Sequence, residues 1–242
     1  MAIDHTAWGR PDAKTLQDRT HEYHKGVIIG QGYSTIAWIP EAEGSWALPL
    51  LHERISSWSS PIEKADSQLK LVCSQSVNPV LTVLDREYGS NATWVLAQAD
   101  IQADCLMRVR KNAYLWSAPP AYSGRGRPRK HGFKMRLNDP TTWLEADTAI
   151  EIDEHPQLGQ VRVSQWLDLH FYRAPGHPVN LILALKNESH VKRSAVSTLV
   201  VGLGGRTNST QAKLFGLSIY DVLEWIIGIG VLSNDYIGHC LT

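Results

Sequence analysis

The chain has 242 residues, 43% of them hydrophobic, which is enough for one large domain or two small ones with a substantial core. Its formal net charge is zero, which excludes a protein that binds polyanions over its whole surface, so any nucleic-acid site must come from local clustering of charge. The three cysteines are widely spaced and form no CxxC pair, which favours a reducing, intracellular setting. No signal peptide is expected, because Asp4, His5 and Arg10 interrupt the N-terminus early.

The chain opens with two predicted strands. Ala2–Trp8 has a short apolar entry and reads as a strand, and residues 9–19 are polar and read as a loop. Gly26–Pro40 is rich in β-forming residues, and its glycines predict a bulge or turn near Gly30 and Gly32.

A third strand and a helix are expected next. Ser45–Ile55 predicts an edge strand, because Pro49 cannot donate a hydrogen bond to a neighbouring strand. Ser60–Ser74 predicts a helix, which Ser60 and Pro61 begin. Four apolar residues keep the spacing of one helix face, namely Ile62, Ala65, Leu69 and Val72.

The stretch VLTVLDREYGS, residues 80–90, organises the rest of the chain. Four apolar residues lead into Asp85, and an acidic residue at the end of a buried strand is where an open α/β sheet places its chemistry. A strand-end aspartate more often caps the next helix, and the feature that favours metal binding is a second carboxylate, Asp4. Ala92–Ala99 then predicts a short helix, and Cys105–Val109 a further strand.

The resulting order, β-β-β-α-β-α-β, is that of an RNase H-like domain. We therefore predict an α/β fold with an RNase H-like mixed sheet, flanking helices and a β-rich insertion. In that fold the first and fourth strands are neighbours, so Asp4 and Asp85 converge at one edge. Two such carboxylates can share divalent metal ions, which activate a water or a 3′-hydroxyl and stabilise the leaving oxygen of a phosphodiester.

A strongly basic stretch follows. Residues 108–136 contain nine Lys or Arg and no Asp or Glu, centred on SGRGRPRKHG. A solvated basic loop is one interpretation, and a DNA contact is the other, since a long uncompensated run of charge repels itself unless an anion is near. The Gly-Arg-Pro-Arg core is similar to an AT-hook, whose arginines enter a narrow minor groove. The candidate DNA-binding residues are Arg125, Arg127, Arg129 and Lys130.

Residues 138–172 look rich in strands. AIEID and QVRVSQWLDLHFY alternate in polarity and are separated by HPQLG, which predicts a hairpin. Asp168 and His170 lie on the second run, and we interpret them as exposed strand residues in preference to metal ligands.

From about residue 2 to about residue 180 the chain resembles the insertion-sequence transposases with a DDE catalytic core. The segments that carry the resemblance are IDHTAWGRPDAKTLQDRT, GYSTIAWIPE, GSWALPLLHERI, LDREYG, GRGRPRKHG, LNDPTTW and LDLHFY. The resemblance implies DNA strand cleavage and strand transfer dependent on Mg²⁺ or Mn²⁺, with Asp4 and Asp85 as the first two catalytic and metal-binding acids. It implies that the partner is double-stranded DNA, in the form of transposon ends and target. It leaves a homodimer open, and it places the protein with the nucleoid in the cytoplasm.

The resemblance also divides the chain. Residues 1–110 are expected to form the catalytic core with its first two acids, residues 111–190 the basic loop and the β-rich insertion, and residues 191–242 a degenerate tail in place of the last catalytic helix. Family members carry a further region before the first acid, so we expect the N-terminus to be truncated.

The third acid does not follow the family pattern, which is Tyr-x2-Arg-x3-acid-x6-Lys on a late helix. Glu224 lacks both the preceding arginine and the following lysine. Possible codons for residues 218–229, read two nucleotides out of frame, yield YLRRFRVDHWYR. We therefore hypothesise a frame broken between about Lys192 and Gly216, with the acid encoded across Trp225 and Ile226. Sequencing the gene tests this.

The apolar tail, Leu217–Leu232, is too short for a membrane span and carries Asp221 and Glu224, so no membrane partner is expected. Two functions remain open. One is a transposase fragment that is inactive as encoded, and the other is a catalytically dead DNA-binding remnant that occupies element ends through its basic loop. A different RNase H-like nuclease is disfavoured by the family segments.

Overall fold

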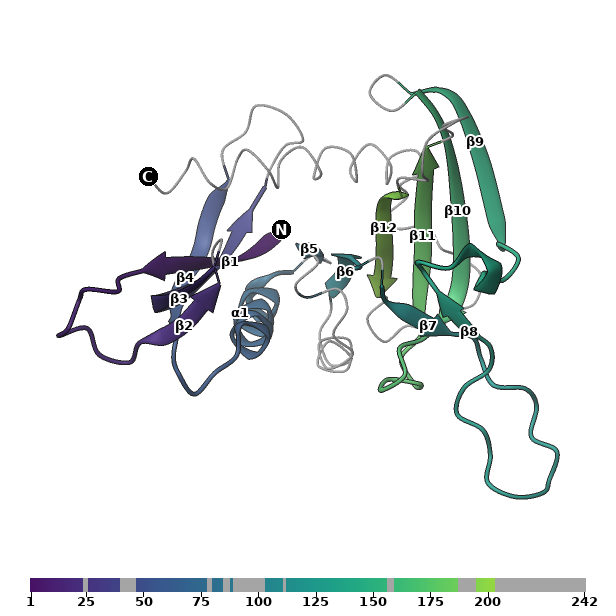
Figure 1. Cartoon of the computed structure of the whole chain (residues 1–242), viewed down its shortest axis with the longest axis horizontal. Coiled ribbons are helices and arrows are strands. Elements are labelled where there is room, and N and C mark those ends of the chain that lie inside the picture. Colours follow the sequence, from purple (N-terminus) through teal and green to yellow (C-terminus); the bar gives the residue numbers. More distant parts are fainter. Residues whose placement is uncertain are drawn as a thin grey trace.

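The fold is seen in a computed structural model of the whole chain (Figure 1). It describes residues 1–23, 26–39, 47–77, 80–84, 88, 103–110, 112–155, 159–186 and 195–202. The first part of the chain forms β1 Ala2–Gly9, β2 Thr20–Tyr23, β3 Val27–Trp38, β4 Leu48–Ile55, α1 Pro61–Gln75, β5 Val80–Leu84 and β6 Ala103–Arg108. The second part forms β7 Tyr114–Trp116, β8 Lys134–Arg136, a 3-10 helix Pro140–Thr142, β9 Thr148–His155, β10 Gly159–Leu169, β11 Val179–Lys186 and β12 Ala195–Gly202.

Ten of the described strands form one mixed sheet. Their order is β2-β3-β1-β5-β6-β12-β11-β10-β9, and β4 also pairs with β3. β1 is antiparallel to β3 and parallel to β5, and β5 is parallel to β6. The predicted α/β class with an RNase H-like mixed sheet is confirmed, and so is the predicted adjacency of the first strand and the strand that leads to Asp85.

Helix α1 covers one face of the β1–β3–β4 part of the sheet. Ser60 caps it through a capping box: the Ser60 side chain accepts from the Glu63 backbone N–H, and the Glu63 carboxylate accepts from the Ser60 N–H. Ala65 and Leu69 on its buried face are fully enclosed. The predicted helix is confirmed, and its end differs by one residue.

The glycines of β3 do not interrupt it, so the turn or bulge predicted near Gly30 and Gly32 is wrong. β3 pairs with β1 in continuous register from Gly30 to Ala37. A Cβ built on Gly30 would lie 2.0 Å from the Trp8 carbonyl oxygen, so the glycine serves the close approach of two strands. The register of β4 on β3 shifts later, between Ile36 and Ala37.

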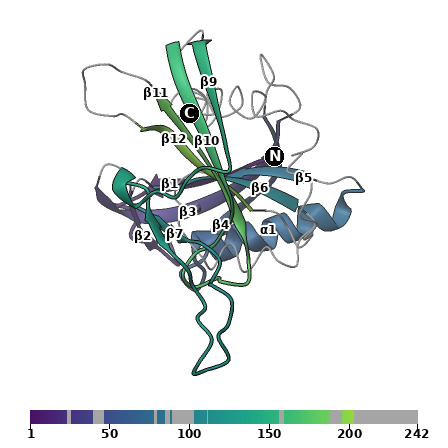
Figure 2. The ribbon, with the colours of Figure 1, turned by 90° about the vertical axis from the view of Figure 1, so that its right-hand side faces the viewer.

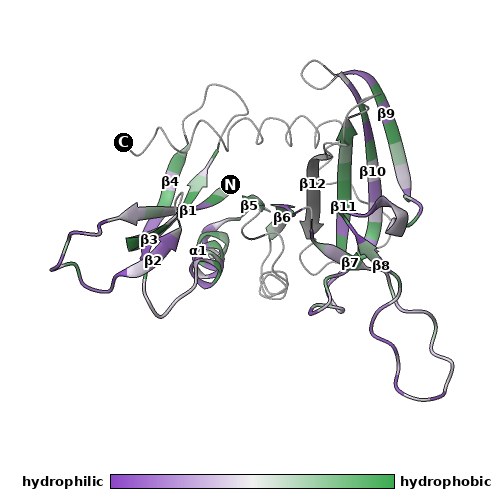
Figure 3. Ribbon diagram, viewed as in Figure 1, coloured by the Kyte–Doolittle hydropathy of each residue, from purple (hydrophilic) through white to green (hydrophobic). Residues whose placement is uncertain are grey.

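The sheet continues through the second half of the chain. β9 and β10 form the predicted antiparallel hairpin, and β11 and β12 extend the sheet from β10 back to β6. Figure 2 shows that β9–β12 run steeply across the direction of β1 and β3, so the sheet is strongly twisted. Figure 3 shows the apolar character of β11, whose residues from Leu181 to Ala184 are all buried.

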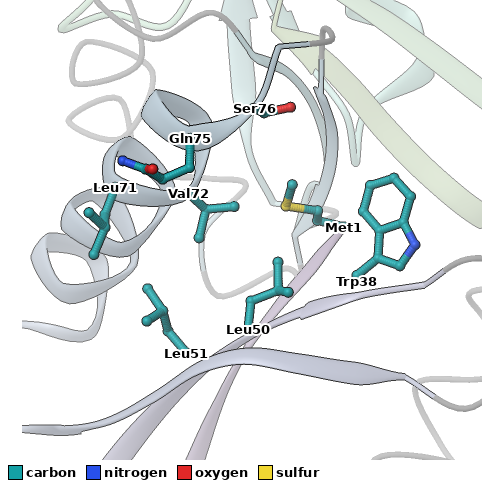
Figure 4. Close-up of a pocket in the computed structure, with 8 residues that line it drawn as sticks. All are labelled: Met1, Trp38, Leu50, Leu51, Leu71, Val72, Gln75 and Ser76. Carbon is teal, nitrogen blue, oxygen red and sulfur yellow. The ribbon is translucent and has the colours of Figure 1, made fainter.

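An apolar groove of about 550 Å³ lies beside the C-terminal half of α1 (Figure 4). Its lining residues are Met1, Trp38, Leu50, Leu51, Leu71, Val72, Gln75 and Ser76. Helix α1, which borders the groove, packs on the face of the sheet opposite to Asp4. Within the described ranges, no helix combines the length and the apolar character that crossing a bilayer requires. The helix predicted over Ala92–Ala99 lies outside the described residues.

Candidate active site and basic loop

Asp4 lies on β1, between β3 and β5 in the sheet. Its neighbour His5 is opposite Ser34, whose hydroxyl donates to the Gln68 side-chain oxygen of α1 at 2.7 Å. Because side chains alternate along a strand, Asp4 projects from the face opposite α1. The Asp4 side chain is half-buried there, opposite Thr35 on β3.

Asp85 lies outside the described residues, but the strand that leads to it is well placed. β5 is parallel to β1, and Ile3 is opposite Leu84. In the sequence, the residues that follow this pair are Asp4 and Asp85. β5 is covered on both faces, since Val83 and Leu84, which point to opposite faces, are both buried.

Carboxylate oxygens are the ligands that Mg²⁺ and Mn²⁺ prefer, so Asp4 fits a divalent ion in donor type. Among the residues that the structure describes, no three His, Cys, Asp or Glu side chains gather closely enough to hold a metal. Asp85, the other predicted ligand, lies outside the described residues. Glu224 and the residues proposed to encode the third acid, Trp225 and Ile226, lie there too.

The basic loop is the second part of the candidate site. Residues 118–130 are all exposed, and Figure 1 shows them extending from β7 and β8 away from the sheet. Gly124 and Gly126 have positive φ angles of 83° and 76°, which place Arg125 between two left-handed turns. The Tyr122 hydroxyl donates to the Gly126 carbonyl at 2.8 Å. The four basic residues of the loop (Arg125, Arg127, Arg129 and Lys130) are thus presented to solvent.

A short ladder closes the base of this loop. β7 and β8 pair antiparallel, with Leu115 opposite Met135, and both side chains are fully buried. The Ser117 N–H donates to the Phe133 carbonyl at 2.9 Å, and the Phe133 N–H donates to the Ser117 hydroxyl at 2.8 Å. The two ends of the loop therefore lie side by side, next to the β7–β8 pair.

Two histidines extend this anchor. His131, at the end of the loop, places Nδ1 2.9 Å from Nε2 of His170, and the two rings stack. Trp116 exchanges both backbone hydrogen bonds with His170 at 2.9 Å. Burial, and secondly the neighbouring His131, lower the pKa of His170. This pair ties the loop to the residue that directly follows β10.

The interpretation of Asp168 and His170 as exposed strand residues is right for Asp168 and wrong for His170. Asp168 is exposed and has a left-handed φ of 53°, at the irregularity where β10 changes register on β11. His170 is only 3% exposed: it follows β10, its backbone pairs with Trp116 of β7, and its ring stacks on His131. Neither residue lies in a group of metal ligands among the described residues.

The structure brings the start of β1 and the end of β5 together, but it keeps the basic loop apart from them. In Figure 1, β1 lies in one half of the molecule and the loop projects from the other. Sequence reasoning missed the β7–β8 ladder and the His131–His170 contact. A usable signal was the pair of short apolar segments, YLW and KMR, that flank the loop.

Comparison with known families identifies most of the chain. A family model described as DDE superfamily endonuclease matches residues 1–169 of the 242. The matched span includes Asp4, the end of β5 and the whole basic loop. A search of curated proteins found no match.

Proposed function

Because the chain belongs to the DDE superfamily endonucleases, we propose that it derives from the transposase of an insertion sequence. Such an enzyme cleaves DNA strands and transfers them by metal-dependent phosphodiester chemistry. The proposal includes that this copy is inactive as encoded, since no third acid follows the family pattern. Its partners would be double-stranded transposon ends and target DNA, bound by a homodimer at the nucleoid in the cytoplasm.

The observation that carries the proposal is the parallel pairing of β1 with β5. Ile3 is opposite Leu84, and in the sequence these two residues are followed by Asp4 and Asp85. Carboxylates on adjacent parallel strands can share one metal ion, which a pair on distant strands cannot.

Asp4 and Asp85 would hold Mg²⁺ or Mn²⁺. When bound, the metal activates a water or a 3′-hydroxyl for attack on phosphorus and stabilises the leaving oxygen. Asp4 contributes a carboxylate fixed by the central strand of the sheet, so little ordering is needed when an ion binds. The basic loop would contact DNA phosphates, which adds affinity without choosing a sequence.

Metal binding by the full chain tests the two acids without requiring activity. We expect Asp4→Asn and Asp85→Asn each to weaken Mn²⁺ binding by at least about tenfold, because losing a ligand costs no less than disturbing its hydrogen-bonded support. The measurement is a titration followed by the paramagnetic resonance of free Mn²⁺. Asp153→Asn, an exposed carboxylate of β9, is the matched control and should bind as the parent does. Equal Mn²⁺ binding by all four proteins would refute the assignment.

A second candidate function is a DNA-binding remnant without chemistry, which the exposed loop favours. Mn²⁺ binding measured together with nicking of element-end DNA separates the two. Mn²⁺ binding that Asp4→Asn weakens, without nicking, fits the inactive transposase, whereas DNA binding without Mn²⁺ binding would favour the remnant. Nicking that persists in Asp85→Ala would show that the chemistry lies elsewhere.

A further inference from the structure

A row of aromatic side chains crosses three strands of the sheet. Trp8 on β1 meets Tyr33 on β3 edge-on, with ring centroids 6.1 Å apart. Tyr33 in turn stacks on His52 of β4, with centroids 5.1 Å apart and planes within 2° of parallel. We call these three residues the aromatic row.

The aromatic row lies on the same face of the sheet as Asp4. Thr35 is opposite Asp4 on one side and His52 on the other, and its hydroxyl is 2.8 Å from His52 Nδ1. Trp8 is four residues along β1 from Asp4, so the alternation of side chains returns it to that face. At about 3.3 Å per residue, the two positions are about 13 Å apart.

The aromatic row is exposed to solvent and has a cation in contact with it, so DNA can reach and bind it. The Trp8 side chain is 42% exposed, and the His52 ring is exposed. The Arg10 guanidinium lies over one face of the Trp8 ring, 4.2 Å from its centroid. Arg54 of β4, two residues from His52, is paired with Asp18 at 2.9 Å. A base can stack on a ring whose other face carries a guanidinium, and the guanidinium can hold a phosphate.

We propose that the aromatic row binds unpaired nucleotides next to the reacting phosphodiester, with bases stacked on Trp8 and His52 and a phosphate held by Arg10. This inference rests on the proposed function and names the form of DNA that the site accepts. A duplex base is covered on both faces by its neighbours, whereas an unpaired base offers a free face. The aromatic row therefore selects distorted or frayed DNA over intact duplex.

The rival explanation is that the rings only stabilise the sheet. Cross-strand aromatic pairs stabilise sheets in this way. That role needs no nucleotide and gives no preference among DNA probes, so binding measurements separate the two explanations.

The test compares three fluorescent probes on the full chain without divalent metal: a blunt duplex of about 20 base pairs, the same duplex with an overhang of about five thymidines, and the same overhang with abasic sites. We expect the parent to bind the thymidine overhang at least about tenfold more tightly than the abasic one, since one stacked base alone supplies about that much. Trp8→Ala should reduce this ratio of affinities, because only His52 then stacks a base, and Trp8→Phe should reduce it less.

Trp58→Ala is the matched control, because Trp58 is 94% exposed and lies outside the row. It should leave the ratio unchanged. Arg127→Ala with Arg129→Ala should weaken all three probes equally, because phosphate contacts do not read bases. A parent that binds the duplex but shows no difference between the two overhangs overturns the aromatic row alone. A parent that binds no probe overturns the proposed function as well.

Discussion

His170 is buried at the base of the basic loop, where its ring stacks on His131 and its backbone pairs with Trp116 of β7. A buried imidazole is destabilised when it gains a proton, because the charge loses its water and meets a second histidine. The lowered pKa of His170 means that the unfolded chain binds this proton more readily than the folded chain. The contribution of His170 to stability is thus complete above the unfolded pKa of about 6.5 and is lost as the pH falls from there toward the lower folded pKa.

We expect the free energy of unfolding, measured with urea, to fall as the pH drops from 7 to 5.5. His170→Gln should flatten this slope, since glutamine cannot titrate. His177→Gln replaces a half-exposed imidazole nearby and should retain the parental slope. An identical slope in His170→Gln and the parent would show that other groups cause the loss.

At the residue scale, the sequence could predict those side chains whose role is local. Ser60 begins the helix that its pattern indicates, and Asp4 lies on the strand that was assigned to it. The His131–His170 contact could not be predicted, because 39 residues separate the pair and only the closure of the loop brings them together. The aromatic row could not be predicted from the sequence either, because it depends on the registers of β1, β3 and β4.

Among the elements, α1 has the clearest dependence on one side chain. The Ser60 hydroxyl satisfies a free N–H of the first turn, which water would otherwise have to reach. Ser60→Ala should lower the free energy of unfolding by about 1 kcal/mol. Ser67→Ala, in the exposed middle of the same helix, is the control. It should raise the free energy of unfolding by a few tenths of a kcal/mol, and by no more than roughly 0.5 kcal/mol, because alanine favours the helix. Thermal or urea unfolding measures both.

Prediction of elements succeeded where a long pattern is regular and failed where strands are short. α1, β5 and the β9–β10 hairpin have clear periodicity, and all were anticipated. β2 and the β7–β8 pair have only three or four residues each, too few for a periodic pattern to show. Pro49 correctly marked β4 as an edge strand, since β4 pairs with β3 alone among the described strands.

On the scale of the whole molecule, the chain is neutral, yet one loop concentrates its exposed positive charge. Neutralising three arginines (Arg125, Arg127 and Arg129, all to Ala) should weaken binding to duplex DNA. The slope of log K against log salt concentration should become shallower by about 2.7, since each phosphate contact contributes about 0.9. Anisotropy titrations over a series of salt concentrations give this slope.

The control for this loop is Arg162→Ala, an exposed arginine of β10 that lies 3.9 Å from Glu151. It should leave the salt dependence of DNA binding as it is in the parent. A triple variant with the parental slope would show that DNA binds elsewhere. Because the loop and Asp4 lie in different halves of the molecule, the triple variant should still bind Mn²⁺ normally.

The position of β12 has a consequence for any shortened form of this protein. Within the described part of the sheet, β12 alone lies between β6 and β11 and hydrogen-bonds to both. A chain that ended before Ala195 would leave β6 and β11 with unpaired backbone groups along one side each. Such bare edges recruit strands from other molecules. Loss of this one strand would therefore turn a self-contained sheet into a template for self-association and precipitation.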